Sequence, residues 1–154
     1  MEITRQIEWD AAHRVMMHES KCATLHGHRY RALITVTIDK LDDLGRVVDF
    51  GVIKERVGGW VDNTWDHTTL INHYDHDLRD FCDAQAAKGN RKPYIIAGEP
   101  TAENIAAELL TVSARLLSGT GVTIVRVEVF ETPNCSATAY EPSDAAKPRF
   151  THPG

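Results

Sequence analysis

The sequence has no long apolar run, no cluster of basic residues and few cysteines. No stretch approaches the roughly 20 consecutive apolar residues of a membrane-spanning helix, so we expect no membrane segment. The 17 Lys and Arg are outnumbered by 22 Asp and Glu and form no basic stripe, which argues against nucleic acid as the main partner. Three widely spaced cysteines, Cys22, Cys82 and Cys135, argue against a disulfide framework. We therefore expect a reducing, cytoplasmic location, since the amino terminus also has a strand pattern instead of a charged leader.

The length and composition are those of one ordinary globular domain. The chain has 154 residues, of which 42% are hydrophobic and 25% charged, and this is enough to bury a core. We expect a single domain over residues 1–140. Three prolines interrupt residues 141–154, which we expect to be a mobile tail.

Hydrophobic periodicity predicts an α+β fold. Alternation favours strands over 2–14, 26–39, 122–132 and 135–140, and a short apolar run favours another over 94–96. Helical spacing predicts helices from residue 50, over 76–87, and from Thr101, which is a good N-cap. We expect helices on one face of an antiparallel sheet. The predicted helical stripes are Phe50, Ile53, Val57, Trp60 and Val61; Leu78, Phe81 and Cys82; and Ile105, Leu109, Val112 and Leu116.

Three histidines are predicted to meet at one end of this sheet. His26 and His28 are two residues apart at the start of a strand, so both imidazoles point to the same face. His13 ends the preceding strand on the matching face, and antiparallel pairing would bring it beside them. Three imidazoles with a vacant fourth position are typical of a catalytic zinc site. The alternative is three histidines bonded to backbone carbonyls, which is a costly arrangement without a shared partner.

Cys22 lies four residues before His26, in a loop that must arch over such a site. A nearby cation would favour its thiolate form and make it a competent base or nucleophile. Cys22 could instead be a fourth zinc ligand, which would close the site, or simply a small buried residue. The residues alone leave these alternatives open.

Two acidic residues further along the chain are candidates for the chemistry. Asp66 precedes His67, and an acid beside a histidine can set its tautomer in a proton relay, although a helix-exit Asp next to a surface His explains the pair equally well. Glu131 shares strand parity with Val127 and Val129, whereas Ile124 falls on the opposite face. A carboxylate that closes an apolar row needs a partner, either an Arg of the protein or a heterocycle that offers two parallel N–H donors.

Two further candidate sites are weaker. Glu103 lies in the first turn of the predicted helix, where the helix dipole already explains an acidic residue. His73, Asp75 and His76 form a compact group that could bind a second metal ion, although a surface position for both histidines is the simpler interpretation.

Five separated motifs carry a resemblance to a known family. They are His13, Cys-x3-His-Gly-His at 22–28, Asp66-His67, Pro-Thr-Ala-Glu-Asn at 100–104, and Glu131-Thr132. In this order, from about Ile3 to Tyr140, the chain resembles the 6-pyruvoyl-tetrahydropterin synthase / 6-carboxy-tetrahydropterin synthase family. The resemblance implies the tunnelling fold, in which subunits join their sheets into a barrel, commonly as a dimer of trimers with active sites between subunits.

The resemblance also implies roles for the motif residues. His13, His26 and His28 would bind Zn²⁺. Cys22 would abstract a proton, with Asp66 and His67 completing a relay. Glu131 would anchor the amino-pyrimidine edge of a pterin, with Thr101, Glu103 and Thr132 nearby.

The resemblance further implies a pterin triphosphate substrate, 7,8-dihydroneopterin triphosphate or a close relative. The Cys-x3 spacing is similar to that of the bacterial carboxy-forming enzymes of queuosine (7-deazaguanine) biosynthesis, which are carbon–carbon lyases that release acetaldehyde and triphosphate. The pyruvoyl-forming enzymes have a longer spacing and are the first alternative. A non-catalytic pterin- or zinc-binding homologue is the second.

Overall fold

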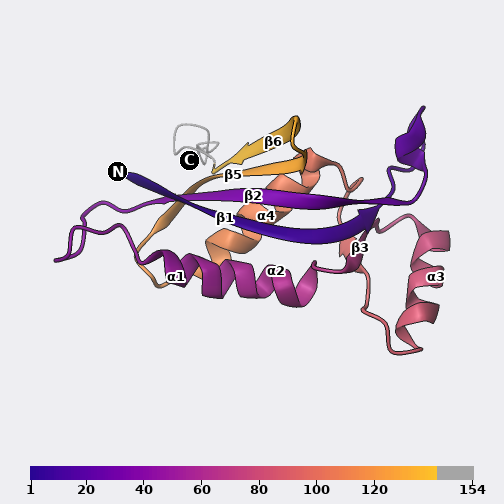
Figure 1. Ribbon diagram of the computed structural model, residues 1–154, viewed down its shortest axis with the longest axis horizontal. Coiled ribbons are helices and arrows are strands. Elements are labelled where there is room, and N and C mark those ends of the chain that lie inside the picture. Colours follow the sequence, from indigo (N-terminus) through magenta and orange to yellow (C-terminus); the bar gives the residue numbers. More distant parts are fainter. Residues whose placement is uncertain (142–154) are drawn as a thin grey trace, which may run out of the picture.

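Two long neighbouring strands run through the middle of the computed structural model, which describes residues 1–141 (Figure 1). β1 (Glu2–His13) and β2 (His26–Thr37) pair antiparallel over their whole length, so the last residue of β1 lies opposite the first residue of β2. On one face of this pair the stacked rings of Trp9 and Tyr30 are fully buried. Both predicted strands are confirmed, and each ends one or two residues earlier than predicted.

The sheet of the described residues has six strands in the order β4-β3-β1-β2-β5-β6. Beyond β2, β5 (Thr123–Thr132) and β6 (Cys135–Tyr140) continue the antiparallel pairing as predicted. On the other side of β1, β3 (Thr68–Asn72) and β4 (Tyr94–Ile96) are parallel to β1 and to each other. The prediction of a wholly antiparallel sheet is therefore wrong on this side.

β3 was missed because its five residues carry no alternating pattern. Its sequence is a short, mostly buried run, and periodicity alone does not identify such a strand. A parallel neighbour also requires a crossover connection. The segment between β3 and β4 provides it with α3 (His76–Ala86), so the predicted helix over 76–87 is confirmed.

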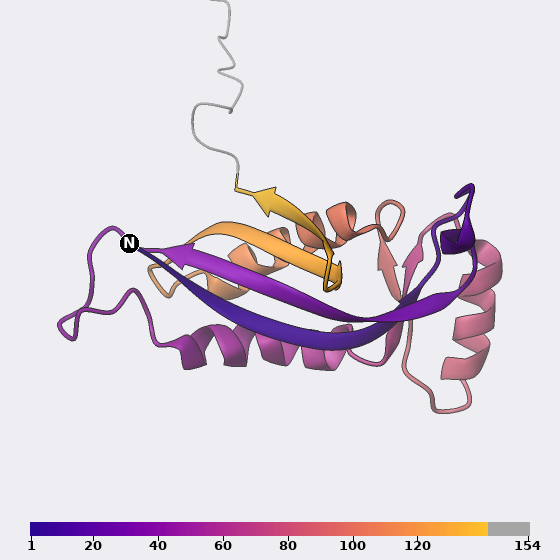
Figure 2. The same ribbon diagram turned by 45° about the horizontal axis from the view of Figure 1, so that its top comes forward.

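The remaining helices cover one face of the sheet (Figure 2). α1 (Phe50–Ile53), the π-helical turn η2 (Lys54–Gly58) and α2 (Gly59–Thr64) follow one another without a break. α4 (Ala102–Leu117) packs beside them, mainly on β5 and β6. Their apolar side chains and the buried face of the sheet form the main hydrophobic core. The other face of the central strands carries polar and charged side chains.

Three predicted core positions are wrong. Phe50 is 48% exposed because it lies at the start of α1, outside the buried stripe. Phe81 is 57% exposed because α3 buries only a narrow side through Leu78 and Cys82. Ile124 is buried although its parity predicted the opposite face, since a β-bulge between β2 and β5 shifts the register next to it.

The cap of α4 is as predicted. The Thr101 hydroxyl accepts a hydrogen bond from the Asn104 N–H at 3.4 Å. None of the helices in residues 1–141 has the length and apolarity needed to cross a bilayer. The predicted tail lies outside the described residues, apart from Glu141.

Candidate active site

The three predicted histidines meet where β1 ends and β2 begins. Cross-strand pairing puts His13 directly opposite His26, and His28 lies two residues further on the same face. The ring centroids are 4.6 Å apart for His13 and His26, 5.1 Å for His13 and His28, and 4.9 Å for His26 and His28. His13 is almost fully buried, whereas the other two rings are partly exposed. We call these residues, together with Glu131, the histidine cluster.

Backbone carbonyls orient two of the three rings. His13 Nδ1 lies 2.7 Å from the Pro100 carbonyl oxygen, and His26 Nδ1 lies 2.6 Å from that of Thr24. Because a carbonyl can only accept, Nδ1 carries the proton in both residues. Neutral rings of this tautomer then direct their Nε2 lone pairs at each other across 3.2 Å. Such a contact is unfavourable unless a cation or a proton lies between the two nitrogens.

The Glu131 carboxylate completes the histidine cluster. Its Oε1 atom lies 3.0 Å from His13 Nε2 and 3.0 Å from His28 Nε2. Glu131 shares the face of the buried Val127 and Val129 and lies at an irregularity in the pairing of β5 with β6, between Phe130 and Thr132. Glu131 was predicted to need a partner, either an Arg or a heterocycle, and within the described chain its partners are instead these two histidines.

The local environment shifts two pKa values in the cluster. The close contact with the His13 imidazole lowers the pKa of Glu131, against the opposing effect of burial, and the neighbouring imidazoles lower it further. Burial lowers the pKa of His28 and outweighs the attraction of Glu131. The arrangement therefore favours an ionised carboxylate beside a neutral His28 ring.

The donor set of the cluster fits a zinc ion. One ligand atom from each of the four residues lies within 4.8 Å of the other three, and all four are nitrogen or carboxylate oxygen donors. Two ligands about 2.0–2.1 Å from a tetrahedral zinc are about 3.3 Å apart, close to the observed separation of the His13 and His26 nitrogens. His28 Nε2 is buried and makes no hydrogen bond in the described structure, although Glu131 is near. A cation would satisfy this nitrogen and relieve the facing lone pairs.

Cys22 lies on the loop that joins the two strands. The loop contains a short 3-10 turn, η1 (Lys21–Ala23), and its base is closed by a 2.9 Å hydrogen bond from the Val15 N–H to the Cys22 carbonyl. Both ends of the loop are histidines of the cluster, so the loop arches from one metal-ligand candidate to the other. The thiol is free and half-buried.

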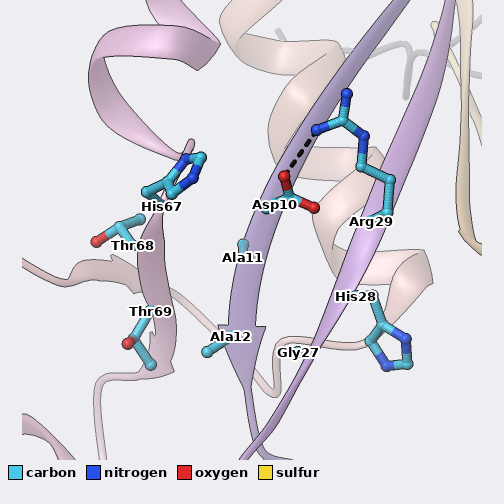
Figure 3. Close-up of a pocket in the computed structure, with 9 residues that line it drawn as sticks. All are labelled: Asp10, Ala11, Ala12, Gly27, His28, Arg29, His67, Thr68 and Thr69. Carbon is cyan, nitrogen blue, oxygen red and sulfur yellow. Dashed lines mark hydrogen bonds and ion pairs between the residues drawn. The ribbon is translucent and has the colours of Figure 1, made fainter.

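Asp66 and His67 contact each other directly but lie on the other side of the sheet from the histidine cluster. His67 Nδ1 is 2.7 Å from Asp66 Oδ2, and the other Asp66 oxygen accepts the Asp10 N–H at 2.9 Å. Along β1, Asp10 faces opposite to His13, and its carboxylate groups with Asp66 and His67. In Figure 3 His67 lies at the start of β3 and His28 on β2, with β1 between them. Within one chain, the structure does not bring this pair to the cluster.

The backbone and electrostatics of this pair are unusual. His67 has a positive φ of 57°, which only a small fraction of non-glycine residues adopt, and it is 71% exposed. Burial raises the pKa of Asp66, but the Asp10 N–H and the His67 imidazole together outweigh it, so the pKa lies below its ordinary value. The pair is therefore an ionised carboxylate that holds an exposed imidazole.

A groove of about 550 Å³ lies beside this pair, over β1, β2 and β3 (Figure 3). The two long strands approach closely at Gly27, where a Cβ would lie 3.2 Å from the Ala11 carbonyl oxygen. Arg29 forms its other wall and bonds to Asp10 at 2.7 Å and to Glu8 at 3.2 Å. The groove thus combines the exposed imidazole of His67 with the guanidinium of Arg29, which is already paired with two carboxylates.

The other predicted binding residues are placed near the cluster or on the surface. Thr101 follows Pro100, whose carbonyl contacts His13, and its hydroxyl caps α4. Glu103 is exposed in the first turn of α4. Thr132 is half-buried next to Glu131, and its hydroxyl accepts the Asn134 N–H at 3.4 Å.

The second metal patch is not formed around Asp75. This carboxylate is 3% exposed, receives a bidentate hydrogen bond from Arg14 at 2.5 and 2.6 Å, and caps α3 through the Leu78 N–H at 3.2 Å. In the described residues, the only groups of three or more close ligand side chains are the histidine cluster and the group of Asp10, Asp66 and His67.

The sequence reasoning also missed the residues that support the cluster. The Pro100 carbonyl and the carboxylates of Asp75 and Glu99 connect the loop after β1 to the segments around β3 and β4. No spacing rule finds such contacts, since the partners are between 61 and 87 residues apart for the bonds to Arg14, Met16 and His13. The sequence offered one signal for these contacts, which is the place of Asp75 directly before the predicted helix. That place indicates a helix cap and no contact with Arg14.

Known proteins resemble this chain over most of its length. A protein from Rickettsia bellii named 6-carboxy-5,6,7,8-tetrahydropterin synthase is 39% identical over 136 residues, covering 88% of this chain and 96% of the relative. A protein of the same name from Bacillus subtilis is 38% identical over 80 residues, covering 51% and 52% of the two chains. Among solved structures, an uncharacterized protein from Wolinella succinogenes matches with a TM-score of 0.77 at 22% identity, covering 92% of this chain and 98% of that one. The Caenorhabditis elegans 6-pyruvoyl tetrahydropterin synthase matches with a TM-score of 0.64 at 20% identity, covering 92% and 96%.

These likenesses agree with the fold and with the motif order. The structural neighbours have the fold of this chain, which the resemblance of the sequence to tunnelling-fold proteins predicted. The sequence model of the 6-pyruvoyl tetrahydropterin synthase family matches residues 2–142, which includes every motif residue discussed above. The chain therefore belongs to the 6-pyruvoyl tetrahydropterin synthase family.

Proposed function

We propose that this protein is a zinc-dependent 6-carboxy-5,6,7,8-tetrahydropterin synthase. It would convert 7,8-dihydroneopterin triphosphate and one water molecule to 6-carboxy-5,6,7,8-tetrahydropterin, acetaldehyde and triphosphate, in queuosine (7-deazaguanine) biosynthesis. The reaction breaks a carbon–carbon bond of the substrate side chain, so the enzyme is a lyase. The names of the Rickettsia and Bacillus relatives support this choice of product.

The observation that carries the proposal is the convergence of three imidazole nitrogens on one point. His13, His26 and His28 present their Nε2 atoms to each other, and backbone carbonyls hold the other nitrogen of the first two. When bound there, zinc supplies a Lewis acid that makes a substrate hydroxyl more acidic. The histidines would hold the metal, and their carbonyl partners would keep each ring in the correct tautomer.

Glu131 has two properties that suit an anchor for the pterin. It is ionised in this environment, and a carboxylate accepts two parallel N–H bonds from an amino-pyrimidine edge. Its position beside the metal ligands would place the heterocycle close to the reacting side chain. Thr101, Glu103 and Thr132 would contribute to the same pocket from the start of α4 and the end of β5.

Cys22 would remove a proton from the substrate side chain. The loop that carries it begins and ends at metal ligands, so the thiol would remain close to the metal-bound part of the substrate. Asp66 would hold His67 in the tautomer that relays the proton.

The separation of this relay from the histidine cluster supports an assembly in which copies share sites. Asp66 and His67 lie on the sheet face opposite to the cluster of the same chain, and His67 is 71% exposed. We propose that the pair from one copy completes the site of a neighbouring copy in a homo-hexamer built as a dimer of trimers. An isolated chain would then bind zinc but lack the relay.

One alternative remains within the family and one outside catalysis. A pyruvoyl-forming enzyme would use the same residues and eliminate triphosphate without cleaving the carbon–carbon bond. The Cys-x3 spacing of the loop favours the carboxy-forming reaction. A binding homologue without turnover would not need Cys22, Asp66 and His67 together.

Product analysis separates these functions. The zinc-loaded protein is incubated with 7,8-dihydroneopterin triphosphate and the products are identified by mass spectrometry. We expect 6-carboxy-5,6,7,8-tetrahydropterin and acetaldehyde. A pyruvoyl product would replace the proposal with the first alternative, and bound zinc without turnover would replace it with the second.

A further inference from the structure

Glu99 connects three parts of the chain that surround the histidine cluster. Its Oε1 atom accepts a hydrogen bond from the Asn72 side-chain amide at 2.7 Å, at the end of β3. Its Oε2 atom accepts the Met16 N–H at 2.8 Å, in the loop that carries Cys22. Its backbone carbonyl accepts the Asn104 amide at 2.8 Å, in the first turn of α4. One half-buried residue thus joins the loop, the sheet edge and a helix.

These contacts fix the peptide that orients His13. Pro100 follows Glu99, and its carbonyl accepts from His13 Nδ1 at 2.7 Å. The Asn104 side chain also packs closely against the residue before Glu99, since a Cβ on Gly98 would lie 3.1 Å from the Asn104 amide nitrogen. The direction of the Pro100 carbonyl is therefore determined by the position of the segment 98–100, and Glu99 holds that segment through both its side chain and its backbone.

The two side-chain contacts require a carboxylate. Both partners donate N–H groups, and an ionised carboxylate offers two acceptor oxygens and no donor. A glutamine in this place would satisfy one partner and direct its NH₂ group at the other. Such a mismatch destabilises the fold more than a missing hydrogen bond does, because the NH₂ group of the glutamine would face the NH₂ group of Asn72 in a half-buried place.

We propose that Glu99 is a positioning residue of the site. Its carboxylate sets the direction of the carbonyl that holds the His13 tautomer, and it sets the path of the loop that brings Cys22 to the site. Glu99 makes no hydrogen bond or ion pair with the four residues of the cluster in the described structure, and it acts through the Pro100 carbonyl on His13 and through the Met16 N–H. For its effects on turnover and on zinc binding this inference rests on the proposed function, whereas its effect on the thiol does not.

The variant Glu99→Gln tests this role without pterin. Zinc affinity is measured by competition with a chromogenic chelator, and loop order by the rate at which iodoacetamide alkylates Cys22 in the metal-free protein. We expect zinc to bind about 10–100-fold more weakly, which is the loss typical when a group that orients a metal ligand is removed. We also expect Cys22 to be alkylated faster than in wild type. Glu55→Gln is the matched control, because Glu55 is exposed and its side chain makes no hydrogen bond in the described structure.

A double variant tests whether the hydrogen bonds cause the effect. Combining Glu99→Gln with Asn72→Asp exchanges donor and acceptor between the two side chains. The new carboxylate can accept from the new amide and still accept the Tyr74 N–H, which Asn72 now accepts at 3.0 Å. The new amide oxygen can accept the Met16 N–H. We expect the double variant to bind zinc more tightly, and to alkylate more slowly, than Glu99→Gln alone.

The outcomes are distinct. Wild-type zinc affinity and alkylation rate in Glu99→Gln would overturn the inference, and so would equal weakening in the single and double variants, because the loss would not then come from these two bonds. If the single variant does not fold, recovery of folding and zinc binding in the double variant supports the inference, and no recovery overturns it. Failure of the wild-type protein to turn over 7,8-dihydroneopterin triphosphate would affect the proposed function alone.

Discussion

The histidine cluster and the Asp66–His67 pair carry the same types of side chain but are built differently. In the cluster, three imidazoles and a carboxylate lie on the helix-covered face, and carbonyls of two different segments hold the rings of His13 and His26. The pair lies by the opposite face, where backbone contacts with β1 hold it: the Asp66 carboxylate accepts the Asp10 N–H, and the His67 N–H bonds to the Asp10 carbonyl at 2.7 Å. The imidazole of His67 itself remains exposed.

The difference indicates which half of the site one chain completes by itself. A buried set of donors with oriented rings is preorganised before any ligand arrives. An exposed imidazole on a strained backbone has no ligand to act on within its own chain, which suits a group that faces a neighbouring copy. The following experiments test this contrast, and those expected to abolish metal binding or turnover come first.

Removing a ring from the cluster should abolish metal binding. In His28→Ala we expect bound zinc to fall from about one per chain to a small fraction, because only two of the three imidazole ligands would remain. Metal content by atomic emission spectroscopy checks this, with His76→Ala at the exposed start of α3 as the control. A full complement of zinc in His28→Ala would contradict the assignment of the three ligands.

Removing the thiol should abolish turnover but keep the metal. For Cys22→Ala we expect kcat to fall about 10²–10⁴-fold, the usual contribution of a positioned base, while zinc and pterin binding persist. Steady-state kinetics and metal content measure the two properties separately. Cys135→Ser, at an exposed cysteine, should behave as wild type. Unaltered turnover in Cys22→Ala would remove the thiol from the mechanism.

Mixing two inactive variants tests whether copies share sites. His28→Ala would lack a proposed metal ligand and His67→Ala would lack the proposed relay, so neither should turn over substrate alone. If each site takes the two halves from different chains, random reassembly of an equal mixture restores about a quarter of the sites. Activity of the reassembled mixture measures this. No recovery in mixed oligomers would mean that each chain supplies its whole site.

Glu131→Gln should weaken pterin binding while the fold persists. An amide cannot accept two parallel N–H bonds, so we expect the Kd of a pterin to rise about 10–100-fold, as for the loss of one charge-assisted hydrogen bond. Isothermal titration calorimetry and circular dichroism measure binding and fold. Glu128→Gln on the same strand is the control, because Glu128 faces away from the cluster and bonds to Ser136. Unchanged affinity would count against the anchor role.

The support of the loop should contribute to the stability of the fold. Asp75→Asn removes the partner of Arg14 and should lower the free energy of unfolding by about 3 kcal/mol, since the carboxylate is buried. Asp83→Asn on the same helix should cost less than about 0.5 kcal/mol, because its pair with Arg79 is 3.7 Å long and exposed. Urea unfolding measures both. Equal losses would show that the buried pair contributes nothing special.

The contribution of Asp75 should also depend on pH. The hydrogen bond from Arg14 lowers the pKa of Asp75 below the ordinary value of 3.8, so the unfolded chain takes up this proton at a higher pH than the folded protein does. The stabilisation is therefore fully present above that ordinary value and is lost as the pH falls through the lowered pKa. Unfolding of wild type and Asp75→Asn at several pH values should converge in acid. A constant difference would contradict the assignment.

Much of the site could be predicted from the sequence because it lies on local patterns. The parity of His13, His26 and His28 with the buried residues of their strands determines the face they share. Antiparallel pairing of the two adjacent strands then brings the three rings to the same end of the sheet. Thr101 as a cap depends on neighbouring residues in the same way. By contrast, the face of Ile124 depends on a bulge against another strand, and no pattern in β5 reveals it.

The sequence by itself determined which side chains could form the site and which face of β1 and β2 would carry the three imidazoles, because strand alternation is a local property of the backbone. Only the tertiary structure decided that Glu131 turns into that cluster, that the Pro100 carbonyl and Glu99 hold it in place, and that Asp66 and His67 lie on the opposite side of the sheet. These contacts join residues far apart in the chain through a bulge, a parallel crossover and a loop. Their positions follow from packing of the whole domain, which no local spacing encodes.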